Sequence, residues 1–161
     1  AKMRQQFRLT IFQFSLIEKT ILKKKYYKEF VFNTLMEQNY GFKNYDRKIE
    51  NGVESMDLYN DRTMYAVKIG NTSSKLCYVV DQSISSLKMY KSKLISDFPE
   101  IDAVAIWIIL ERKNKLNEKN GRVDINELNM LMLKNKIDSW KKTVRLMGYK
   151  PIIYINYYED N

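Results

Sequence analysis

The sequence predicts an α/β domain in which helices flank a mixed central sheet. Residues 104–110 form a continuous apolar run, which is typical of a strand buried on both faces. Residues 53–59 and 63–69 have the composition of two strands around a short polar turn, and they predict a β-hairpin. Apolar residues recur every three or four positions in three further segments, as they do in amphipathic helices. These patterns together are typical of helices and strands packed in layers.

The expected order of elements is helix, hairpin, helix, buried strand, helix and strand. Their approximate ranges are 18–38 for the first helix, 53–69 for the hairpin, 73–94 for the second helix, 104–110 for the buried strand, 138–147 for the last helix and 151–158 for the closing strand. Residues 8–17 fit either a buried strand or the start of the first helix. Residues 70–73 supply a turn and an N-cap. The last helix has a cap at Asp138 or Ser139 and ends at Gly148.

The composition excludes several kinds of chemistry. The chain has 161 residues, 45% of them hydrophobic, with 5 Gly and 2 Pro, which indicates a globular domain with a core. It has no His and one Cys, so a Ser-His-Asp triad, a His zinc site and an intrachain disulfide are excluded. The scattered glycines form neither a dinucleotide-binding turn nor a P-loop. Catalysis would therefore depend on carboxylates, Lys, hydroxyl groups and a hard metal ion.

The charge of the chain favours a polyanionic partner. Lys and Arg number 28 against 19 Asp and Glu, a net charge of +9, so nucleic acid is the expected partner, DNA more than RNA. The alternative is codon bias, since A/T-rich codons favour Lys, Asn, Ile and Tyr. No stretch approaches the roughly 20 apolar residues of a membrane span. A cytoplasmic protein without membrane attachment is expected.

Five short motifs occur in a characteristic order. They are YDRK at 45–48, VESMDL at 53–58, YAVK at 65–68, SSKL at 73–76 with Gln82, and VRLMGY at 144–149. From about Tyr26 onward, the chain therefore resembles the C-terminal region of a sporadically distributed bacterial family of unknown function. It departs from that family at Ala66, where His is usual. The resemblance implies that residues 1–161 are a single α/β domain, the C-terminal part or a fragment of a longer protein in a mobile-element or defence setting.

The layout around the hairpin also resembles the restriction-endonuclease-like PD-(D/E)XK nuclease core, a three-layer sandwich. That resemblance implies that carboxylates hold Mg²⁺, that the metal activates water and that a Lys stabilises charge on phosphate. Asp57 would be one metal ligand, and Glu54 or a helix acid such as Glu29 would be the second. Lys68 would be the catalytic lysine, and Gln82 would orient water or the backbone.

The register of the hairpin decides which acid approaches Lys68. The acid usual two residues before the Lys is absent, because that position is Ala66. A three-residue loop places Glu54 opposite Lys68, whereas a two- or four-residue loop pairs Asp57 with Ala66, diagonal to Lys68. Only a bulge would bring all three charged groups together. The competing interpretation is a Glu54–Lys68 ion pair across the strands, with Asp57 capping a turn.

Basic side chains elsewhere are candidate phosphate contacts. The residues chosen are Lys113, Arg122, Lys141, Lys142 and Arg145. The last three are expected to share one side of the last helix, which suits phosphate contacts whose affinity falls with salt; a solvated face is the alternative. The predicted function is a nucleic-acid-binding domain, either a divergent metal-dependent nuclease or an inactive one. The alternative class is a non-catalytic interaction or oligomerisation domain that forms a homodimer. The apolar terminal strand is expected to pack on the sheet or to pair with another subunit.

Overall fold

The computed structural model describes residues 8–10, 29–45, 49–50, 53–54, 56–92, 98–112, 116–119, 122–123 and 125–158. In chain order, the elements are β1 (Arg8–Thr10), α2 (Glu29–Tyr40), β2 (Lys43–Asn44), β3 (Ile49–Glu50), β4 (Val53–Glu54), β5 (Leu58–Asn60), β6 (Thr63–Gly70), α3 (Ser73–Lys91), β7 (Ala103–Glu111), β8 (Glu118–Lys119), β9 (Arg122–Val123), the 3-10 helix η2 (Ile125–Leu128), α4 (Leu131–Leu146) and β10 (Lys150–Tyr158).

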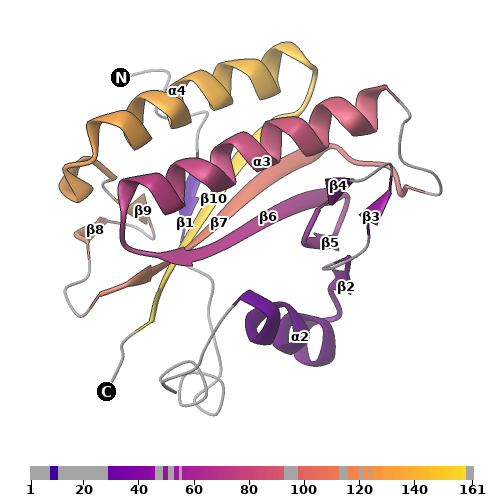
Figure 1. Ribbon diagram of the computed structural model, residues 1–161, viewed down its shortest axis with the longest axis horizontal. Coiled ribbons are helices and arrows are strands. Elements are labelled where there is room, and N and C mark those ends of the chain that lie inside the picture. The colour runs from indigo at the N-terminus through magenta and orange to yellow at the C-terminus, as the bar shows by residue number, and fades with distance from the viewer. Residues whose placement is uncertain are drawn as a thin grey trace.

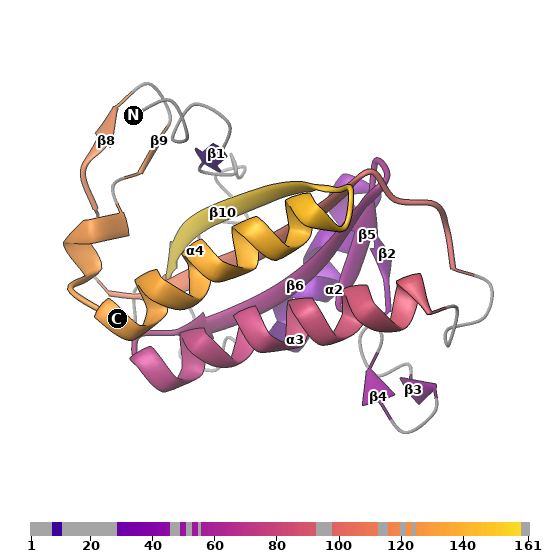
Figure 2. The ribbon, with the colours of Figure 1, turned by 90° about the horizontal axis from the view of Figure 1, so that it is seen from above.

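The centre of the fold is a mixed sheet with the strand order β1-β10-β7-β6-β5-β2. The strands β6, β7, β10 and β1 run parallel to their neighbours, and β5 and β2 continue the sheet in antiparallel fashion. The helices α3 and α4 lie side by side over one face, and α2 covers the opposite face (Figures 1 and 2). The predicted α/β architecture with a mixed central sheet is therefore confirmed.

The strand β7 is the buried strand that the sequence predicts. Its residues from Ala103 to Leu110 are all buried. Alternate side chains face opposite layers, so that Ile106 and Ile108 pack with α3 and α4, whereas Trp107 and Ile109 pack with α2. The apolar run fits because helices cover both faces of the sheet.

The hairpin has a two-residue loop. Asn60 pairs with Thr63, and the residues between them, Asp61 and Arg62, have φ angles of 45° and 56°. Two consecutive left-handed residues are typical of the type I′ turn that suits the twist of a hairpin. The first strand is shorter than expected, because Glu54 pairs with Ile49 in the separate β3–β4 ribbon.

The helix α3 begins as predicted, since the Thr72 side chain accepts a hydrogen bond from the Lys75 backbone N–H at 3.4 Å. The helix α4 begins at Leu131 rather than near Asp138, a correction to the expected range. Leu133 and Ile137 extend its buried face by two turns, and this packing outweighs the capping signal at Asp138. The helix stops as expected at Gly148, which has a φ of +94° that favours glycine.

The segments near the two ends of the chain are described only in part. Residues 18–28 of the first expected helix lie outside the described residues, and α2 continues to Tyr40. Arg8–Thr10 is a strand beside β10. The terminal strand β10 lies between β1 and β7, so it packs in the sheet, and the described β1 pairs with its residues Ile152, Ile153 and Tyr154. In the described part of the chain, no helix is long and apolar enough to cross a bilayer.

Candidate active site

The strand β6 extends beyond its partner β5. The described pairing with β5 covers residues 63–65, so the backbone N–H groups of Val67 and Ile69 point past the end of that strand. Each of them donates to a carboxylate instead. Val67 N–H donates to Asp57 Oδ2 at 2.8 Å, and Ile69 N–H donates to Glu29 Oε1 at 3.1 Å. Two acids from different elements are therefore held two residues apart along this edge, a strand length of about 6.6 Å.

Lys68 lies between these two positions in β6, and its side chain extends to one of the two acids, Glu29. Its Nζ atom is 3.3 Å from Glu29 Oε1 and 5.6 Å from the centre of the Tyr78 ring on α3. The ammonium group therefore bridges the helix that covers one face of the sheet and the helix that covers the other. About a quarter of the Lys68 side chain, 26%, is exposed, so the group is accessible from the edge.

Asp57 is fixed by its backbone as well as by its side chain. It is buried, with 6% of its surface exposed. Its N–H donates to the Tyr65 carbonyl at 3.0 Å, and its carbonyl accepts from the Tyr45 N–H at 2.9 Å. These bonds, with the one from Val67, hold the carboxylate in one orientation.

The two-residue loop decides the question of register. The described pairing ends at Leu58 and Tyr65, and the Asp57 N–H donates to the Tyr65 carbonyl, so Asp57 lies at the end of this pairing rather than in a regular pair with Ala66. Glu54 is paired with Ile49 in a different sheet, so the expectation that Glu54 lies opposite Lys68 in the hairpin is wrong. Ala66 is buried against α3 and α4. Glu29, the other acid considered, is the one beside Lys68.

Gln82 lies on the same flank of α3 as Tyr78. The two residues are four apart in α3 and so project from the same side of the helix. Gln82 is half-buried. Its expected role in orienting water or the backbone stays a prediction.

The acids suit a small divalent cation with few protein ligands. Among the described residues, no group of three or more Asp, Glu or Cys could hold a metal ion. Mg²⁺ commonly takes one or two carboxylates and completes its shell with water and substrate phosphates. The carboxylates of Asp57 and Glu29 are hard oxygen donors of this kind, so they fit such an ion.

The predicted basic stripe on α4 is not a single exposed surface. Lys142 is exposed, but Lys141 is buried with 9% of its surface exposed, and it lies 4.0 Å from Asp138. The reason is that Lys141 follows Ile137 by one turn and so lies beside the buried face. Arg145 is half-buried, and its Nη2 atom is buried without a hydrogen bond in the described part of the chain. The three side chains lie within about 100° of one another around α4, as expected, but only Lys142 among them is exposed; their contact with phosphate stays a prediction.

The other two basic candidates are located only in part. Arg122 begins β9 and pairs with Lys119 of β8. Lys113 lies outside the described residues.

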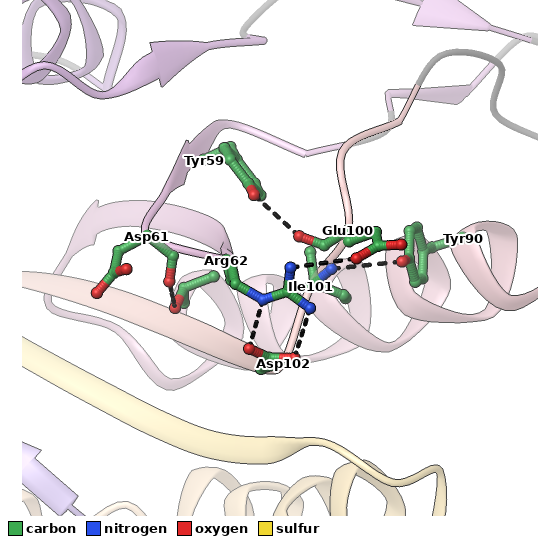
Figure 3. Close-up of polar contacts among 8 residues, drawn as sticks. Tyr59, Asp61, Arg62, Tyr90, Glu100, Ile101 and Asp102 are labelled. Atoms are coloured by element: carbon green, nitrogen blue, oxygen red, sulfur yellow. Dashed lines mark hydrogen bonds and ion pairs between the residues drawn. The ribbon is translucent and has the colours of Figure 1, made fainter.

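A polar cluster that sequence reasoning missed joins the hairpin turn to β7 (Figure 3). Arg62 donates to Asp102 through Nε at 2.5 Å and Nη2 at 2.9 Å, and to Glu100 through Nη1 at 3.1 Å. The Arg62 carbonyl also accepts the Asp102 N–H at 2.8 Å. These hydrogen bonds raise the pKa of Arg62 and lower the pKa of Asp102. The cluster holds the start of β7 against the hairpin. In the sequence, the two acids just before the apolar run, Glu100 and Asp102, are the residues that could have indicated it.

No family model, curated protein or solved structure matches the chain.

Proposed function

We propose that this chain is a nucleic-acid-binding domain that hydrolyses phosphodiester bonds with a divalent metal ion, on a restriction-endonuclease-like sheet. The observation that supports it most is that Asp57 and Glu29 accept the Val67 and Ile69 N–H groups of the β6 edge, with the Lys68 ammonium beside Glu29. The order α2, β2, β5, β6, α3, β7, with an antiparallel hairpin followed by a parallel strand, agrees with that layout.

Asp57 and Glu29 are the residues that would hold the metal ion. A bound Mg²⁺ supplies an activated water molecule and neutralises charge on the phosphate. The rigid backbone contacts of Asp57 keep its carboxylate oriented before any ion binds. Preorganised ligands of this kind avoid the cost of reorganisation during the reaction.

Lys68 would act on the substrate rather than on the metal. Its ammonium group is held at the edge by Glu29 and the Tyr78 ring. When water attacks phosphorus and the bond to the leaving oxygen breaks, negative charge increases on the phosphate oxygens, and a nearby ammonium stabilises it. The excess of positive charge on the chain, +9, favours a polyanionic substrate.

Cleavage of single- and double-stranded DNA and RNA with Mg²⁺ or Mn²⁺ tests this function. The variants are Asp57→Asn, Glu29→Gln and Lys68→Ala. The two amide variants keep an oxygen that accepts the Val67 or Ile69 N–H while they remove the charge. Metal-dependent cleavage is expected to fall at least about 100-fold in each, a loss typical of a removed catalytic group.

A matched control shows whether a loss of cleavage is specific to the site or follows the removal of any acidic side chain. Asp61→Asn makes the same chemical change at an exposed turn residue at the other end of β6, and it is expected to cleave as the wild type does. Cleavage that survives in Asp57→Asn and Glu29→Gln, or no cleavage by any folded form, contradicts the proposal. Salt-sensitive binding without cleavage would leave a binding domain.

A non-catalytic interaction domain is the second candidate, and one observation favours it. The helix α4 exposes the large apolar side chains of Leu131 (72%), Met132 (63%) and Leu146 (89%). At about 100° per residue, these three project within about 100° of one another around the helix axis. This function predicts self-association, measured by light scattering, that is lost on Leu146→Glu and is independent of Asp57 and Lys68.

A further inference from the structure

Asn33 is a fully buried residue of α2, with 0% of its surface exposed. Both atoms of its carboxamide, Nδ2 and Oδ1, are without a hydrogen-bond partner in the described part of the chain. Burying an amide without partners costs free energy that an apolar side chain of the same size would not cost. An asparagine at such a position indicates a partner outside the residues that the structure describes.

The position of Asn33 along α2 brings it level with the Asp57 carboxylate. The first residue of α2, Glu29, accepts the Ile69 N–H. The end of α2 leads to β2, which pairs with β5, and β5 in turn pairs with β6 at Met64. The helix therefore runs opposite to β6. Asn33 follows Glu29 by four residues, about 6 Å, and two residues of strand measure about 6.6 Å. This displacement leads from Ile69 back to Val67, whose N–H binds Asp57.

The position of Asn33 around α2 directs it toward the sheet edge. Phe32 packs edge-on against Trp107 of β7, with ring centroids 4.7 Å apart, so that flank of the helix faces the middle of the sheet. Asn33 follows Phe32 by about 100°. It therefore lies on the other flank of the buried face, toward the edge of β6 where Asp57 and Lys68 lie.

We infer that Asn33 is a third protein ligand of a divalent cation, giving its Oδ1 atom beside the carboxylates of Glu29 and Asp57. The inference rests on the proposed function for the identity of the cation site. Amide oxygen is a hard donor that such ions accept. It adds a ligand without adding charge.

Binding of Mn²⁺ alone, measured by isothermal titration calorimetry and by electron paramagnetic resonance, tests the inference without any nuclease assay. Asn33→Leu is expected to weaken Mn²⁺ binding at least tenfold. In EDTA the same variant is expected to melt at a higher temperature than the wild type, because it removes two unsatisfied buried atoms. Asn33→Asp is expected to bind Mn²⁺ more tightly than the wild type. This variant tests the inference if Asn33→Leu fails to fold.

Asn156→Leu is the matched control. Asn156 is also buried, but its Oδ1 atom accepts a hydrogen bond from Trp107 Nε1 at 2.8 Å. This variant is expected to melt at a lower temperature, with Mn²⁺ affinity unchanged per folded molecule.

The possible results separate this inference from the proposed function. Mn²⁺ affinity unchanged in Asn33→Leu, or no Mn²⁺ binding by the wild type, overturns the role of Asn33. A lower melting temperature of Asn33→Leu in EDTA together with unchanged Mn²⁺ affinity identifies a structural water partner and overturns it as well. Mn²⁺ binding that depends on Asn33 in a protein that cleaves no nucleic acid supports the ligand and contradicts the nuclease.

Discussion

Asp57 accepts the Val67 backbone N–H through Oδ2 at 2.8 Å, just beyond the point where the described β5–β6 pairing ends. A buried N–H at a strand edge needs an acceptor, and here a carboxylate takes the place of the missing strand. The same side chain is the leading candidate for a metal ligand. Its structural role and its chemical role can be separated by substitution, because an amide keeps the acceptor and loses the charge.

The stability of Asp57 variants follows from this contact. Asp57→Ala leaves the Val67 N–H without its acceptor and is expected to lower the free energy of unfolding by about 1–3 kcal/mol. Asp57→Asn keeps an acceptor and is expected to lose less. Urea denaturation followed by circular dichroism measures both. Equal losses in the two variants would mean that the charge of Asp57, rather than the hydrogen bond, stabilises the edge.

Much of the fold could be predicted from the sequence because its signals are local. An apolar run, a Thr cap and a Gly stop each fix the backbone within a few residues, and β7, the start of α3 and the end of α4 agree with them. The start of α4 could not be predicted, because Leu133 and Ile137 extend the helix through packing on distant elements. Capping signals are weaker than that burial.

The sequence predicts which residues form the candidate site, but it does not predict the groups that those residues contact. Asp57, Lys68 and the helix acid Glu29 follow from the hairpin motif, but the partners do not. Which N–H each acid binds depends on where β5 ends and where α2 packs, and both are tertiary. Asn33, inferred above as a further ligand, does not follow from the motif, although a polar residue on the apolar face of a helix, one turn from Glu29, is a signal that the sequence does contain.

The Glu29–Lys68 ion pair is expected to contribute little to stability. The two side chains are 30% and 26% exposed, and ion pairs accessible to water are usually worth no more than about 1 kcal/mol. A double-mutant cycle with Glu29→Gln and Lys68→Met, measured by urea denaturation, gives the coupling energy. A value above about 2 kcal/mol would contradict this and assign the pair a mainly structural role. A small value beside a large loss of cleavage would support a role in chemistry.

The Arg62–Asp102 pair predicts an acid-sensitive contribution to stability. Hydrogen bonds from Arg62 lower the pKa of Asp102 below its usual 3.8. A carboxyl group with a lower pKa in the folded state stabilises the fold above its unfolded pKa, and that contribution is lost as the pH falls through the folded value. The difference in melting temperature between the wild type and Asp102→Asn is therefore expected to be constant near pH 7 and to shrink below about pH 4.

The same pair is exposed to solvent, so salt provides a second measurement. Added NaCl at about 0.5 M screens exposed charges, and it is expected to reduce the difference between the wild type and Asp102→Asn at pH 7. A difference that is insensitive to both salt and acid would mean that the hydrogen-bond geometry of the turn, rather than charge, is what Asp102 contributes.

Nucleic-acid binding by α4 is expected to depend on Lys142 and not on Lys141. Lys142 is exposed, whereas Lys141 is buried beside Ile137, so a charge reversal at Lys141 disturbs the fold and reports nothing about binding. Lys142→Glu is expected to weaken duplex binding, measured by fluorescence anisotropy, and to reduce the slope of log affinity against log salt by about 1. Lys88→Glu, at an exposed position of α3, makes the same change in net charge elsewhere. If both variants lose affinity equally, the overall charge of the chain attracts nucleic acid and α4 is not a binding surface. A loss of affinity confined to Lys142→Glu would place a phosphate contact on α4.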